Sequence, residues 1–146
     1  MESVLLSLHV LAGILFVGPV AVTTSLFPRY APVGASMPGQ ERSVDTARVL
    51  HRVTRVYGAL TLTVPVVGLV LALVQGRSTE IWVLVAMALT AVAGALLALQ
   101  ITPRQREALD YPDDGAQLRP LGMLSGMFNL LWAVVVILMI VRPGSS

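Results

Sequence analysis

Apolar residues dominate four stretches of the chain, and shorter polar links separate them. The periodicity and length of these stretches predict helices at 4–26, 56–75, 81–101 and 121–141. Each stretch has about twenty residues and no formal charge, which suffices for a helix to cross the roughly 30 Å hydrocarbon core of a bilayer. The pattern therefore predicts an all-α membrane protein, built as a four-transmembrane-helix antiparallel bundle.

The polar links predict how these helices begin and turn. From Ser43 onward the apolar spacing is helical, and Ser43 is a suitable N-cap, so the second helix should start before the membrane and continue into it without a break. Residues 111–115, Tyr-Pro-Asp-Asp-Gly, form a turn sequence. The short link 76–80 predicts that the second and third helices are antiparallel neighbours. Pro19 and Pro65 each remove a helix hydrogen bond and should kink their helices.

Composition agrees with this interpretation and adds an orientation. The 146 residues are 55% hydrophobic and only 12% charged, so that 1–146 forms a single integral membrane domain without a soluble module. All ten basic residues are arginine, and eight of them lie in the links 28–55 and 102–120. The positive-inside rule places these two loops in the cytoplasm and both termini outside. We expect a multi-pass protein of a bacterial plasma (inner) membrane, with the lipid bilayer and no nucleic acid as its partner.

Catalytic and metal-binding patterns are missing from the sequence. The absence of cysteine excludes disulfides, thiolate metal sites and cysteine nucleophiles. The four predicted spans contain no aspartate or glutamate, which argues against an ion pump driven by carboxylates. We assign no catalytic residue and no metal ligand. Whether the protein is an enzyme stays open, and the sequence favours a protein that is not an enzyme.

His9 is the ionisable residue inside the first predicted span, about 8 Å below the outer boundary at 1.5 Å per residue. Ionisable residues inside a membrane are expensive and often functional. One interpretation is a neutral imidazole that is hydrogen-bonded to a serine, to Asn129 or to a carbonyl of a neighbouring helix. A second is a haem ligand or a proton-transfer group, and a third is a histidine that faces lipid. His51 lies across the membrane from His9, and Met139 is the methionine at a similar depth.

A basic stripe precedes the second span. Four side chains at helical spacing share one predicted face and would suit lipid head groups or other anions, namely Arg48, His51, Arg52 and Arg55. The alternative is that these arginines act only as a topology signal.

The segment Leu8-His9-Val10-Leu11, followed by glycine and by Pro-Arg at the end of the span, carries a family resemblance. It resembles the opening helix of small bacterial four-helix membrane proteins, which include HemJ-type protoporphyrinogen oxidases and CopD-like domains. The resemblance implies the fold and a haem-binding role for His9. The lysine that those oxidases carry in the third helix is absent from 82–100, so the resemblance fits a relative better than a working oxidase.

Three functions follow from these observations. The first is a non-enzymatic, accessory or assembly role in a membrane complex, because small residues such as Gly94, Gly122 and Gly126 favour contact with a second copy or with other membrane subunits. The second is a haem- or porphyrin-binding redox protein that uses His9. The third is a small dimeric transporter.

Overall fold

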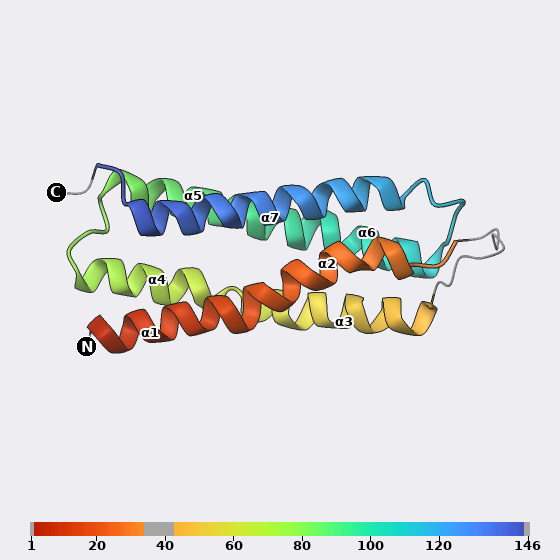
Figure 1. Cartoon of the computed structure of the whole chain (residues 1–146), viewed down its shortest axis with the longest axis horizontal. Coiled ribbons are helices and arrows are strands. Elements are labelled where there is room, and N and C mark those ends of the chain that lie inside the picture. The colour runs from red at the N-terminus through yellow and green to blue at the C-terminus, as the bar shows by residue number, and fades with distance from the viewer. Residues whose placement is uncertain (1, 34–42, 145–146) are drawn as a thin grey trace.

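The fold is a bundle of four long helices, described by a computed structural model over residues 2–33 and 43–144 (Figure 1). Part of the predicted loop 28–55, residues 34–42, lies outside this description. The four helices are long and apolar enough to cross a membrane, which confirms the prediction of four such helices and supports a multi-pass membrane protein. Both ends of the chain lie at the same end of the bundle (Figure 1).

Three of the four long helices consist of more than one element. The elements, in chain order, are α1 (Glu2–Ala12), the π-helical segment η1 (Gly13–Val17), α2 (Gly18–Tyr30), α3 (Val44–Leu60), α4 (Thr63–Val74), α5 (Ile81–Leu96), the π-helical segment η2 (Leu97–Ile101), α6 (Thr102–Asp110) and α7 (Leu118–Val141). The predicted cap is confirmed, since the Ser43 hydroxyl accepts a hydrogen bond from the Thr46 amide at 3.2 Å.

Prolines cause the interruptions. The second long helix breaks at residues 61–62, because Pro65 has no N–H to donate to the Thr61 carbonyl. That carbonyl instead accepts from the Val64 amide at 3.1 Å, which tightens the chain locally. The π-helical segments η1 and η2 end directly before Gly18-Pro19 and Thr102-Pro103. The predicted kinks are therefore present, and the second helix runs past Arg55 before it breaks.

The helices pair differently at the two ends of the bundle. Near the termini α1 packs on α4 and α5 packs on α7, whereas α4 and α5 make few contacts although the link 75–80 joins them. The second and third long helices are thus antiparallel neighbours, as predicted, but they contact each other mainly at α3 and α6 and only sparsely at α4 and α5. Near the loops α2 contacts both α3 and α7, and the bundle closes (Figure 1).

The core lies in the closed half of the bundle. Its buried apolar side chains form two clusters, Phe27, Ala31, Ala47, Ala108, Leu118 and Leu121 near the loops, and Val20, Ala93, Leu97, Ile101 and Phe128 further in. Hydroxyl groups link the same helices: Thr23 and Thr54 share a hydrogen bond of 2.8 Å, and Ser125 donates to the Thr24 carbonyl at 2.7 Å. Such bonds hold helices together where lipid offers no competing partner.

The other half of the bundle buries little of its surface. Only 6% of the most apolar stretch of the first long helix is buried. In the closed half, Gly94, Gly122 and Gly126 also lie on an uncovered side of their helices, because no atom of a neighbouring helix comes within 4 Å of where a Cβ would stand, within the described part of the chain. These glycines do not serve packing inside the described bundle, and contact with a second subunit remains a prediction.

Candidate functional site: a lateral pocket around His9

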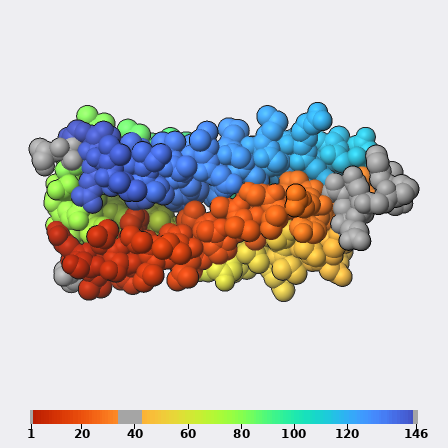
Figure 2. All heavy atoms as spheres, in the orientation of Figure 1, coloured from red at the N-terminus to blue at the C-terminus, as the bar shows by residue number. Residues whose placement is uncertain are grey.

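A pocket of about 880 Å³ occupies the space where the two helix pairs separate. Side chains from α1, α4, α5 and α7 line it, and nearly all of its wall is apolar. Figure 2 shows the surface hollowed between α1 and α7, while α2 and α7 meet directly further along. Ligand pockets in proteins typically measure about 300–1,000 Å³, so this space suits a sizeable apolar molecule.

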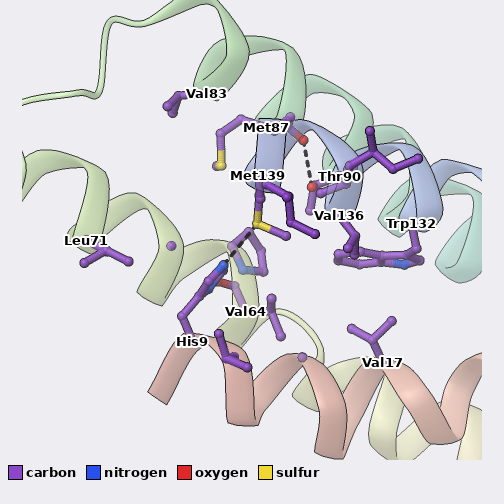
Figure 3. A pocket seen from close by; sticks show the side chains of 18 of the residues that line it. His9, Val17, Val64, Leu71, Val83, Met87, Thr90, Trp132, Val136 and Met139 are labelled. Atoms are coloured by element: carbon purple, nitrogen blue, oxygen red, sulfur yellow. Dashed lines mark hydrogen bonds between the residues drawn. The ribbon is translucent and has the colours of Figure 1, made fainter. Parts of the chain in front are cut away.

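His9 is the ionisable side chain of α1 that reaches into this pocket (Figure 3). Its Nδ1 lies 3.0 Å from the Val64 carbonyl oxygen of α4. Because a carbonyl only accepts, Nδ1 carries the proton and donates it, and Nε2 keeps a free lone pair. The predicted hydrogen bond between His9 and a carbonyl of a neighbouring helix is confirmed. The imidazole ring is half-buried, so it is not a side chain that contacts only lipid.

Gly68 makes room for the imidazole. A Cβ at this position would lie 2.7 Å from Cε1 of His9 and 3.2 Å from Nδ1. Real Cβ atoms essentially never come as close as the first of these distances. The imidazole therefore rests against the bare backbone of α4, one helical turn beyond the carbonyl that it binds.

Met139 of α7 faces His9 across the pocket. Its sulfur lies 3.4 Å from Nε2 of His9, and the two side chains point at each other from opposite walls (Figure 3). Sequence position indicated only that Met139 lies at a similar depth. The contact between residues 130 positions apart is a result of the tertiary structure.

The mouth of the pocket near the chain termini carries polar side chains. Arg142 and Gln75 belong to the lining, as does Trp82. The Arg142 guanidinium lies 5.6 Å from the centre of the Trp82 ring, and its Nε donates to the Met139 carbonyl at 3.2 Å. The Trp82 indole N–H in turn donates to Glu80. A cation is thus held at the rim of an otherwise apolar space.

The opposite end of the pocket contains two polar groups that lack partners. Asn129 donates to the Ser25 hydroxyl at 2.9 Å, which confirms its predicted role between helices. Oδ1 of Asn129 and Nε1 of Trp132 are buried and have no hydrogen-bond partner in the described chain. Unpartnered buried polar atoms of this kind call for an explanation, such as a bound molecule or water.

The predicted basic stripe divides in the structure. His51 is buried, at 8% exposure, and its Nδ1 lies 2.9 Å from Oε1 of Gln105, which is itself fully buried. Arg48, Arg52 and Arg55 are exposed. His51 thus belongs to the contact between α3 and α6, far from His9, while contact of the three arginines with lipid or anions remains a prediction.

Sequence reasoning found His9 but not its surroundings. Gly68 and the Val64 carbonyl were not predicted, because neither a glycine nor a backbone oxygen in an apolar helix gives a signal of its own. No group of three or more His, Cys, Asp or Glu side chains that would hold a metal ion occurs among residues 2–33 and 43–144. No family model, curated protein or solved structure matches the chain.

Proposed function

We propose that this protein is a membrane protein that binds haem or a related porphyrin in the lateral pocket, with His9 as the ligand to the iron. The observation that carries the proposal is the state of the imidazole: Nδ1–H is held by the Val64 carbonyl, and Nε2 points into an apolar space. Histidines that bind metals almost always donate their other N–H in this way, which fixes the tautomer and the ring orientation.

The shape and polarity of the pocket support a porphyrin. The gap between the α1–α4 pair and the α5–α7 pair offers two facing walls, with His9 on one of them. A flat macrocycle between these walls would exchange lipid contacts for contacts with apolar side chains. Arg142 at the mouth is placed to pair with a carboxylate, as the propionates of haem would require.

The chain would supply binding and orientation, and haem would supply one-electron chemistry. The hydrogen bond from Nδ1 of His9 to the Val64 carbonyl fixes the orientation of the imidazole ring. Gly68 leaves the space that this ring occupies. The apolar walls exclude water, and the rim cation favours one orientation of an amphipathic ligand. These roles use only residues that the structure brings together.

The direct test is an ultraviolet–visible spectrum of the full chain, purified in mild detergent from a host with sufficient haem. A Soret band at a stoichiometric level that disappears in His9→Ala is expected. Leu8→Ala, which alters an exposed neighbour in α1, is the matched control and should keep the band. A colourless protein, or a band that survives His9→Ala, would contradict the proposal.

The proposed topology places residues 28–55 and 102–120 in the cytoplasm and both termini outside. Its support is the arginine distribution, with eight of ten on the side of these loops. Since the chain has no cysteine, single cysteines can be labelled without background. Ser78→Cys should react with an impermeant reagent on intact cells, and Ala116→Cys only after permeabilisation. The reverse pattern would invert the proposed orientation.

The accessory role is the second candidate, and one specific observation favours it. No atom of the described chain lies within 4 Å of where a Cβ would stand on Gly94, Gly122 or Gly126, which leaves these positions open to close packing against another membrane subunit. Purification in mild detergent should then recover a homo-oligomer or a stoichiometric partner. A strictly monomeric protein would count against this role and leave the haem proposal untouched.

A further inference from the structure

The contact between His9 and Met139 poses a problem of hydrogen bonding. With the proton on Nδ1, the Nε2 lone pair faces the Met139 sulfur, which has no hydrogen to donate. With the proton on Nε2, the sulfur would be satisfied, but Nδ1 would face the Val64 carbonyl oxygen as a second acceptor. Because the carbonyl is the stronger acceptor, the first arrangement is favoured, and two lone pairs meet at 3.4 Å.

An electrophile between the two atoms would satisfy both lone pairs. Protonation of the imidazole would place a charge inside an apolar region, which is expensive. A metal ion accepts both lone pairs, and a thioether with an imidazole is a known pair of axial ligands for haem iron. The donors come from opposite walls of the pocket, which is the arrangement that ligation on two faces of a macrocycle requires.

We propose that Met139 is the second axial ligand of the haem, so that the pocket holds a six-coordinate, electron-transferring haem. This inference rests on the proposed function. Metal–nitrogen and metal–sulfur bonds of about 2.0 and 2.3 Å mean that Nε2 and the sulfur must separate by about 1 Å from their present distance. Methionine has three rotatable bonds and adapts easily to such a change. With both faces occupied, the iron has no open position for a small substrate.

The arrangement around Met139 supports this role. Its carbonyl accepts from Arg142, whose backbone adopts a left-handed conformation with φ of 49° at the end of α7. These bonds hold the backbone at the end of the helix and leave the Met139 sulfur, which makes no bond to Arg142, to face His9. The same arginine lies at the rim where carboxylates of the ligand would be placed.

The test is Met139→Leu in the full-length protein, a change that nearly conserves volume. We expect the haem to remain bound through His9, the absorption and electron paramagnetic resonance spectra to change from low-spin to high-spin, and the reduced variant to bind carbon monoxide, which the wild type does not. Met127→Leu, an exposed methionine of α7 that does not line the pocket, is the matched control and should leave the spectra unchanged.

The outcomes separate this inference from the proposed function. Unchanged low-spin spectra in Met139→Leu, with haem still lost in His9→Ala, would overturn the role of Met139 and leave the haem proposal standing. Haem that is absent from the wild type, or retained in His9→Ala, would overturn both. If Met139→Leu loses its haem, the variant Met139→His distinguishes a ligand role from a packing role. A low-spin haem in Met139→His supports ligation at residue 139. The absence of bound low-spin haem in Met139→His contradicts ligation at residue 139.

Discussion

Replacing Gly68 with alanine tests whether the backbone of α4 positions His9. The new Cβ would stand 2.7 Å from Cε1 of His9, whereas ordinary contact begins near 3.4 Å. The ring must therefore retreat by about 0.7 Å, away from the helix that carries Val64. A displacement of this size lengthens the 3.0 Å bond between Nδ1 and the Val64 carbonyl beyond the usual range.

The expected change in the free energy of unfolding is the sum of two destabilising contributions and one stabilising contribution. Crowding of a packed site costs about 1–3 kcal/mol, and loss of the hydrogen bond costs about 1 kcal/mol. Alanine in place of glycine returns about 1 kcal/mol of helix propensity. The free energy of unfolding should consequently fall by about 1–3 kcal/mol, and haem affinity, which depends on the orientation of the ring, should fall by about 5- to 150-fold for the same 1–3 kcal/mol of crowding.

The assay is a haem titration of the ligand-free protein in lipid nanodiscs, followed by Soret absorbance. Gly94→Ala is the matched control, because its Cβ would meet no atom within 4 Å in the described chain, and its affinity should equal that of the wild type. The effect of Gly68→Ala on the free energy of unfolding should also vanish when His9 is already alanine. An affinity for Gly68→Ala within twofold of the wild type would refute the reasoning, since the imidazole would then tolerate the lost space.

Further predictions concern the walls, the rim and the closed half of the bundle. Val136→Trp places a large ring in the pocket and should reduce bound haem to below a tenth of the wild-type content without altering the folded state, as measured by haem content and circular dichroism. Arg142→Gln removes the rim cation and should weaken haem binding by up to about fivefold in the same titration, the effect of a partly exposed ion pair. Ser125→Ala removes the 2.7 Å bond to the Thr24 carbonyl and should lower the free energy of unfolding by about 0.5–1.5 kcal/mol in a detergent melt, whereas Ser7→Ala, at an exposed position, should not.

Several features of the fold were predictable because they depend on local chemistry. Four charge-free stretches of about twenty residues are typical of membrane-spanning helices, since a helix satisfies its own backbone groups within lipid. Pro65 interrupts the second long helix by removing a donor, and Ser43 caps the start of that same helix by supplying an acceptor. His9 was identifiable because an ionisable residue stands out among apolar neighbours.

The positions of the helices relative to one another were not predictable by the same means. In a soluble helix the polar face indicates which side is buried, but a span that is apolar all round carries no such signal. The sequence therefore did not reveal that α4 packs on α1 and contacts α5 only sparsely. It also did not reveal that His51 contacts Gln105 while the neighbouring arginines are exposed.

Hydropathy and single-residue chemistry, both present in the sequence, thus indicated the helical class of the protein and its four long apolar helices, and they singled out His9 as the residue to follow. Only the tertiary structure decided what His9 meets: the space over Gly68, the carbonyl of Val64 and the sulfur of Met139. The reason is that these contacts join α1 to two other helices far away in the chain. Packing of apolar surfaces selects such contacts, and no local pattern encodes them.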